Sequence, residues 1–400
     1  MTARGCAFLA LVAAVPLLAC GADGAGREVV ARDSAGVRIV ESSGSRWGAE
    51  DAWRLGEPAL TIGRREGEEA YLFHGIAGAK RLSDGRIVVA DAASNQLRFF
   101  DAEARFLGAV GRAGDGPGEY RFMSALAVLA GDTLAVTDLA GITILDPDGA
   151  YARTIRMGMA GERMAHALGL LAGGAILGAS GSRGFGPADA GTVIRDTLRF
   201  YAFRPDGAFV REVVALPGAE RWGLAAGGRY SFPYVPFAGG PVWAAGRDHF
   251  HVGTGVDADL RVYGEEGGLE RVSRWEVPAR QVTDEDRAAL RSHLLASART
   301  DNARRRDETF LAEAPQAERM PRYQAAVVDA EQNVWLERYR APWEAGPIWD
   351  IIDPGGAWLG AVETPPRFEI RQIGPDFVLG TWRDEADVAY VRVYALMKPE

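Results

Sequence analysis

Five of the segments that connect β-rich repeats place an arginine directly before a large apolar residue. These pairs are Arg121-Phe122, Arg163-Met164, Arg221-Trp222, Arg322-Tyr323 and Arg367-Phe368. A guanidinium group can donate two parallel hydrogen bonds to one carboxylate, so arginines gathered at an opening would suit an anionic ligand such as a carboxylate or an acidic glycan. Glutamate precedes the arginine by one or two residues in three cases, as Glu119 does. The alternative is structural, with each arginine and glutamate joining neighbouring elements and each apolar residue anchoring a strand.

Histidine and serine give weaker indications of chemistry. His249 and His251 alternate along the chain and therefore lie on one face of a strand. Two imidazoles are too few for a catalytic zinc site, which usually has three protein ligands, and surface or packing roles are favoured over a metal site. His74 and His166 are the other histidines considered, and no Gly-x-Ser-x-Gly motif follows a strand. No catalytic residue is assigned.

The glycine-rich stretch GRAGDGPGEYRF, residues 111–122, raises the question of phosphate binding. A P-loop needs Gly-Lys-Ser/Thr at the start of a helix, whereas here Gly118 is followed by Glu119, with strand-like sequence on both sides. The glutamate would repel phosphate. The stretch is therefore predicted to be a connector between two repeats.

Repeats of about 45 to 60 residues supply the elements that position these side chains. In the first copy, RIVVAD, QLRFFD and RFLGAVG are β-rich runs separated by turns, and GAKRL precedes them. Five further copies follow, and the last is one strand short. Residues 54–64 can supply that strand and close a ring. The sequence therefore predicts an all-β, six-bladed β-propeller of four-stranded antiparallel blades; seven blades is the alternative, because residues 36–40 could start another strand.

One segment departs from the strand pattern. Residues 283–318 are rich in Ala, Leu, Arg and Glu, and Thr283 with Asp286 forms a capping-box pattern. Leu290, Leu294 and Ala298 recur at helical spacing. A helical insertion is expected between the fourth and fifth blades.

The amino terminus predicts export. Residues 1–19 hold an early cation, Arg4, and an apolar run that is too short to span a bilayer, as in a signal peptide. The segment ends in Leu-Leu-Ala-Cys, which resembles a bacterial lipobox with Cys20 as the lipidated residue; the alternative is an ordinary signal peptide that contains a cysteine. Residues 20–50 are expected to be a tether, and residues 51–400 the propeller. Gly21 after the cysteine resembles the pattern of lipoproteins sent to the outer membrane.

The overall charge argues against nucleic acid as a partner. The formal net charge is −9, and the only basic cluster is the run of three arginines at residues 304–306. An acidic surface without a basic stripe repels the phosphate backbone.

The first repeat resembles the NHL-type propeller repeat. In VVADAASNQLRFFD the matching positions are Asp91, Asn95 and Asp101, and the second repeat keeps Asp138 and Asp146. Over residues 53–394 the chain resembles bacterial six-bladed propeller lipoproteins related to NHL and SMP-30-like propellers. That resemblance is specific for fold and weak for function. The propellers that it resembles include metal-dependent lactonases and lyases, which hold the metal on the propeller axis.

Together these observations predict a cell-envelope lipoprotein whose propeller binds a peptide, glycan or protein partner without a cofactor. Its membrane contact is expected through the lipid anchor only, at the outer membrane. The alternative is a metal-dependent hydrolase or lyase that uses calcium or zinc. Glu119, Arg121, Arg163, Arg221, Arg322 and Arg367 are the predicted ligand-binding residues at a channel mouth, and the oligomeric state stays open.

Overall fold

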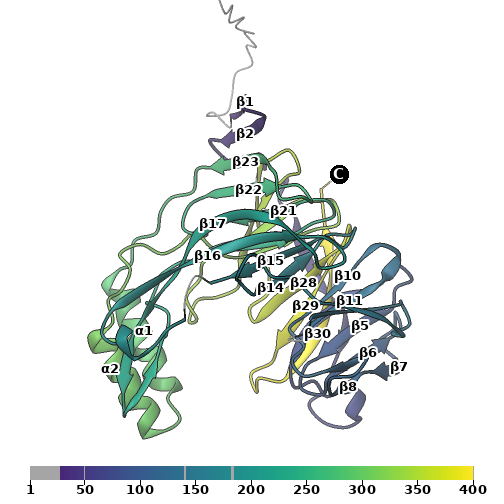
Figure 1. Ribbon diagram of the computed structural model, residues 1–400, viewed down its shortest axis with the longest axis horizontal. Coiled ribbons are helices and arrows are strands. Elements are labelled where there is room, and N and C mark those ends of the chain that lie inside the picture. Colours follow the sequence, from purple (N-terminus) through teal and green to yellow (C-terminus); the bar gives the residue numbers. More distant parts are fainter. Residues whose placement is uncertain (1–27, 49, 139–140, 182–183, 400) are drawn as a thin grey trace, which may run out of the picture.

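Strands account for most of the regular secondary structure. The computed structural model describes residues 28–48, 50–138, 141–181 and 184–399. In this part of the chain, six sheets each contain a set of four antiparallel strands that follow one another from the inside outward (Figure 1). The sheets are the six predicted blades.

The first three blades follow the chain order. Blade 1 contains β4 (Ile76–Arg81), β5 (Ile87–Asp91), β6 (Gln96–Phe100) and β7 (Phe106–Val110). Blade 2 contains β10 (Ala125–Val128), β11 (Leu134–Asp138), β12 (Gly141–Leu145) and β13 (Tyr151–Ile155). Blade 3 contains β14 (His166–Leu170), β15 (Ile176–Ser180), β16 (Val193–Phe203) and β17 (Phe209–Trp222). The first strand of each blade is the innermost.

The last three blades include the closing strand. Blade 4 contains β20 (Val242–Ala245), β21 (Phe250–Gly253), β22 (Asp259–Tyr263) and β23 (Leu269–Trp275). Blade 5 contains β24 (Tyr323–Val328), β25 (Val334–Arg338), β26 (Ile348–Ile352) and β27 (Trp358–Glu363). Blade 6 contains β28 (Phe368–Ile373), β29 (Phe377–Arg383), β30 (Ala389–Met397) and, from the start of the chain, β3 (Arg54–Ile62).

Short elements occupy the connections. The strands among them are β8 (Arg112–Ala113), β9 (Glu119–Tyr120), β18 (Leu224–Ala226) and β19 (Arg229–Ser231). The 3-10 turns are η1 (Glu69–Tyr71), η2 (Ala130–Asp132) and η3 (Pro187–Asp189).

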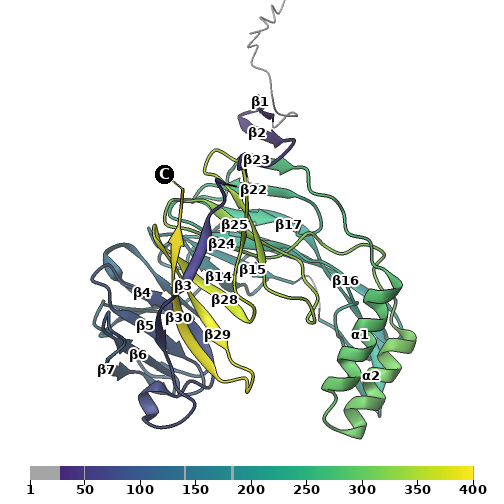
Figure 2. The same cartoon turned by 180° about the vertical axis from the view of Figure 1, so that it is seen from behind.

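The ring closes as predicted. Strand β3 pairs antiparallel with β30, from Arg54 opposite Met397 to Ile62 opposite Val391. Figure 2 shows β3 lying along β30 at the outside of blade 6. Each of the six interfaces between neighbouring blades holds its own cluster of buried apolar side chains, including the interface between blades 6 and 1. Burial of apolar area at every interface is what holds the ring together.

The motif aspartates serve the blade architecture. Asp91 Oδ1 accepts a hydrogen bond from the Gly75 amide (3.0 Å), and Asp138 Oδ2 accepts bonds from the Arg121 and Phe122 amides (2.9 and 2.8 Å). Each aspartate therefore holds the connector that leads into its own blade. Asp146 instead accepts bonds from two amides of its own turn, as expected for a hairpin turn.

The amino-terminal segment joins blade 4 instead of building a seventh blade. Strands β1 (Val29–Ser34) and β2 (Val37–Ser42) form a hairpin, and β2 pairs in parallel with β23 at the outer edge of blade 4. The chain then crosses blade 5, where the Trp47 amide bonds to the carbonyl of Leu359 (2.7 Å). The described part of the expected tether, residues 28–48, is thus packed on two blades, because its alternating strand sequence finds an open sheet edge.

The helical insertion lies where the sequence places it, between blades 4 and 5. Helices α1 (Asp284–Ser297) and α2 (Asp301–Glu313) form a hairpin. Thr283 accepts from the Asp286 amide, and the Asp286 carboxylate accepts from the Thr283 amide, which completes the capping box.

The predicted signal peptide and Cys20 lie outside the described residues. Among those described, neither helix is long and apolar enough to cross a bilayer.

Candidate functional site

The predicted connector arginines each have local partners. Arg121 pairs with Asp115, Arg163 donates to the carbonyl of Gly181, Arg322 to that of Val277, and Arg367 to that of Asp384. The pockets found in the described chain bring no two of these five arginines together. Four of them stand just before an inner strand, as the sequence predicts. A rim shared by the five arginines stays a hypothesis. Arg221 differs from the other four because it does not precede an inner strand.

Glu119 is held within the glycine-rich connector. Its carboxylate lies 2.6 Å from Arg112 and accepts a hydrogen bond from the Gly116 amide (2.9 Å). The Gly116 amide, together with Arg112, holds the pKa of Glu119 below its usual range. Strands β8 and β9 pair in parallel across this loop. The connector is thus stabilised by its own residues.

The apolar partners in the connector pairs divide into two groups. Tyr323 and Phe368 are buried and anchor their inner strands, as predicted. Phe122 and Met164 instead have exposures of 62% and 71%. Inner strands β10 and β14 begin two or three residues later, so these two side chains precede the strand and face solvent.

Arg221 lies on an outer strand instead of in a connector. Strands β16 and β17 contain 11 and 14 residues, more than the other strands of their blade, and Arg221 is on the extended part of β17. Its guanidinium donates to the Phe232 carbonyl (2.9 Å) and to the Tyr234 hydroxyl (2.7 Å). Arg221 Cζ lies 3.9 Å from the centre of the Tyr234 ring and 5.6 Å from that of Phe185. No carboxylate of the described chain forms an ion pair with it.

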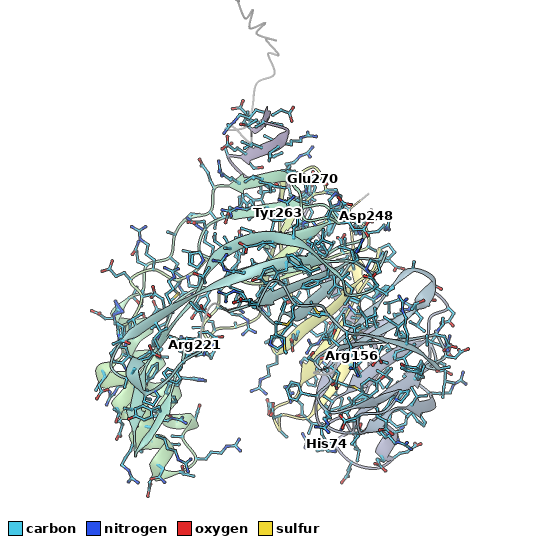
Figure 3. All side chains as sticks on the ribbon, in the orientation of Figure 1. His74, Arg156, Arg221, Asp248, Tyr263 and Glu270 are labelled. Carbon is cyan, nitrogen blue, oxygen red and sulfur yellow. The ribbon has the colours of Figure 1, made fainter. Side chains whose placement is uncertain are left out.

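A cleft opens beside Arg221, with a volume of about 710 Å³. Figure 3 shows Arg221 on the arm formed by the long hairpin and the helices, across from His74 on blade 1. Its aromatic lining comprises Phe185, Tyr234, Phe237, Trp243, Phe310, Tyr323, Tyr339 and Trp343. Arg221 and Asp196 are the charged side chains among the lining residues. The cleft is therefore largely apolar, with few polar groups to fix a ligand.

The helical insertion forms one wall of the cleft. Phe310 of α2 packs with Trp222, Leu224 and Val235, which belong to or follow β17. A second cluster joins Leu290 of α1 to Phe237 and Trp343. Phe237 has φ of 62°, an uncommon conformation for a bulky residue that its buried packing maintains. The wall is thus built into the packing of the propeller.

A buried polar network supports the floor of the cleft. The Trp275 indole donates to the Tyr323 hydroxyl (2.6 Å), which donates to Asp350 (2.8 Å). Arg338 donates two bonds to the same carboxylate, of 2.7 and 3.0 Å. Burial, and next to it the charge of Asp350, raises the pKa of Tyr323, so this phenol stays protonated. The network fixes one side of the cleft.

The propeller axis forms a second hollow, a channel that shares Trp243 with the cleft lining. Its lining comes from the innermost strands of all six blades and encloses about 360 Å³. Many lining residues are small, such as Ala125 and Ala245, and the charged ones are Lys80 and Arg371. The axis is therefore cationic.

The described residues do not bring a set of metal ligands together. In the described ranges, no group of three or more His, Cys, Asp or Glu side chains could hold a metal ion. His249 is partly exposed and lies 3.1 Å from Glu270, whereas His251 is buried in blade 4. Burial, with Arg271 and His249 nearby, lowers the pKa of His251 to about 3, so its ring stays neutral. The ammonium and guanidinium on the axis would repel a divalent cation.

Comparisons with known proteins agree on the propeller. Residues 66–159, which span blades 1 and 2, match the family described as "DUF5128: 6-bladed beta-propeller". No curated protein matches the chain.

Solved structures offer distant likenesses. A putative exported protein from Bacteroides fragilis is 12% identical with a TM-score of 0.46, over 90% of this chain and 100% of that one. A DUF4221 family member from Bacteroides vulgatus is 9% identical with a TM-score of 0.49, over 88% and 100%. A gluconolactonase from Xanthomonas campestris is 13% identical with a TM-score of 0.39, over 86% and 100%. At such identities they bear on neither substrate nor reaction.

Proposed function

We propose that this propeller binds a peptide segment of an envelope protein in the cleft, with an apolar side chain between the aromatic walls and a carboxylate on Arg221. The half-buried guanidinium of Arg221 carries the proposal. It stands at an aromatic cleft, has two ring partners and forms no ion pair with the described chain. A carboxylate would complete its hydrogen bonding.

The lining favours a peptide over a glycan. A sugar presents many hydroxyl groups, which need matching polar partners, and the cleft offers mainly aromatic, proline and glycine surfaces. Aromatic residues and arginine are enriched among the residues that contribute most to binding at protein interfaces. The chemistry therefore supports an apolar side chain as the anchoring group.

Exposed apolar side chains also occur on the connections between blades. Phe122 and Met164 are exposed where their connectors enter the inner strands, and Tyr230 and Tyr234 are exposed in the crossing from blade 3 to blade 4. All four lie in the connections that lead from one blade to the next. Of these, Tyr234 also lines the cleft, so a partner bound there would cover exposed apolar surface on the blade 3 to blade 4 crossing.

The test uses fluorescent short peptides that end in phenylalanine, as the free carboxylate and as the matched amide. We expect the carboxylate to bind better, and Arg221→Ala to weaken its binding at least about tenfold, a typical loss for a charge-assisted contact at an interface anchor. Arg221→Lys should lose part of the affinity, since an ammonium lacks the fork geometry. Arg121→Ala is the matched control on a connector arginine that already has a partner.

Three results would contradict the proposal. They are equal binding of the amide, unchanged affinity in Arg221→Ala, and equal losses in Arg121→Ala and Arg221→Ala. The last result would instead favour the five-arginine rim. If the cleft binds an acidic oligosaccharide and not the peptides, the proposed ligand would have to be a glycan.

We also propose that the protein acts in the cell envelope, anchored at the outer membrane through a lipid on Cys20. The lipobox-like sequence that precedes this cysteine supports it. In cells, Cys20→Ser should move the protein from the membrane fraction to the soluble fraction of the envelope. Unchanged membrane association of the variant would exclude this anchor.

A further inference from the structure

Two cations meet on the propeller axis, where the innermost strands of blades 1 and 6 lie side by side. The Lys80 ammonium on β4 donates a hydrogen bond to the carbonyl oxygen of Arg371 on β28. The Arg371 guanidinium donates to Glu369 (2.8 Å), Thr381 (3.3 Å) and the Ile76 carbonyl (3.5 Å). Both side chains line the channel. The two positive charges therefore line the same channel.

Their charges are incompletely balanced. Lys80 forms no ion pair in the described part of the chain. Glu369, the partner of Arg371, has a side chain that is 67% exposed and does not belong to the channel lining. Burial, with the nearby Arg371, lowers the pKa of Lys80 to about 8, and burial also lowers the pKa of Arg371. An anion at this position would relieve the cost of keeping both groups charged away from water.

The channel has room for a small organic molecule. Its volume of about 360 Å³ is lined by short apolar side chains that include Ala77, Ala127 and Ala326. Apolar walls around two cations suit a ligand with a carbon body and an acidic group better than they suit a bare inorganic ion. The lining itself contains no carboxylate that would compete for the cations.

One mouth of the channel carries charges of both signs. Arg81 and Arg247 line it together with Asp84, Asp329 and Asp376. Asp84 is paired with Arg86 at 2.6 Å, and Asp329 accepts bonds from Asn333 and Trp335. These partners reduce the repulsion that an entering anion would meet at two of the three aspartates.

We propose that the axial channel is a binding site for a small organic carboxylate, held between the Lys80 ammonium and the Arg371 guanidinium. The ammonium and the guanidinium each donate hydrogen bonds to the carboxylate oxygens. Neither residue belongs to the cleft lining, and Trp243 is the residue that lines both hollows.

Calorimetric titration of the full protein with acetate, succinate and inorganic phosphate tests the proposal, with succinamide as the neutral match of succinate. We expect saturable binding of succinate and none of succinamide. Lys80→Met should weaken succinate binding at least about tenfold, and Arg371→Gln should do the same, because each removes one cation of the pair. Arg221→Ala is the control and should leave succinate binding unchanged.

Each contrary result bears directly on the site. Equal binding of succinate and succinamide by the unaltered protein overturns the proposal even when a variant does not fold. Full succinate affinity in folded Lys80→Met overturns it too, as does the absence of saturable binding by any of the three anions at millimolar concentration. Phosphate bound in preference to both carboxylates would overturn the assignment to an organic ligand. Failure of the peptide in the cleft leaves these outcomes untouched.

Discussion

The cleft and the axial channel are hollows of one propeller, but they arise in opposite ways. The cleft exists where blades 3 to 5 depart from the repeat, through the long β16–β17 hairpin, the crossing before β20 and the helical insertion. The channel exists because the six innermost strands follow the repeat. Aromatic rings line the cleft, whereas small side chains and two cations line the channel. In a repeat architecture, inserted segments can therefore form one hollow, while single residues within the repeated strands determine the chemistry of another.

The largest expected effect comes from breaking the polar network that supports the cleft. Asp350 accepts hydrogen bonds from Arg338, Tyr323 and Trp358 inside blade 5. Asp350→Ala leaves the Arg338 charge without its partner, so the free energy of unfolding should fall by about 3 to 5 kcal/mol, measured by urea denaturation. The variant should also lose affinity for the peptide while succinate binding in the channel persists.

An exposed ion pair serves as the control for that variant. Asp115→Ala breaks the pair with Arg121, whose two side chains are 63% and 66% exposed. The expected loss of stability is less than about 1 kcal/mol. Similar losses in the two variants would mean that the network below the cleft contributes no more than a surface pair.

A smaller effect tests the channel: the burial of Lys80 should make the stability of the protein depend on pH. Because burial lowers the pKa of Lys80 from 10.5 to about 8, the unfolded chain holds this proton more tightly than the folded chain. The stability contributed by this group therefore rises with pH between about 8 and 10, by on the order of 1 kcal/mol per pH unit. Arg371 is the charged group that acts on Lys80, and Glu369 is the ion-pair partner of Arg371.

The matched variant for this measurement is Lys80→Met. It should be more stable than the unaltered protein near neutral pH, and the difference should shrink as the pH rises through 8 and 9. Urea denaturation at several pH values measures it. A difference that stays constant with pH would show that Lys80 is not desolvated in the folded protein.

The blades could be predicted from the sequence because their signals are local. Runs of β-branched and aromatic residues, Asp-Gly turns and the Thr283 cap each determine their own element. The missing strand of the last repeat even identifies β3 as its partner. The hairpin on blade 4 is different, since nothing within residues 29–42 tells which sheet edge it joins.

The sites were harder to predict, because they depend on where side chains meet. Arg221 precedes Trp222 and so matches the connector pattern. However, β17 extends to Trp222, so Arg221 lies on this strand and lines the cleft. The aromatic run around Tyr234 was not recognised as part of a site. Lys80 and Arg371 were also missed, although a cation within an inner strand, as in GAKRL and FEIRQI, is a usable signal of an unusual axis.

The β3–β30 pairing also has a consequence for how the chain folds. Its register places residues near opposite ends of the described chain side by side, such as Arg54 and Met397. During synthesis β3 emerges early and has no partner until β30 follows, so closing the ring requires bringing together segments separated by nearly the whole domain. Contacts between such distant segments form slowly, and an unpaired β3 is meanwhile open to pairing with another chain. Completion of blade 6 is therefore expected to be the late step that separates an aggregation-prone open array of blades from the finished propeller.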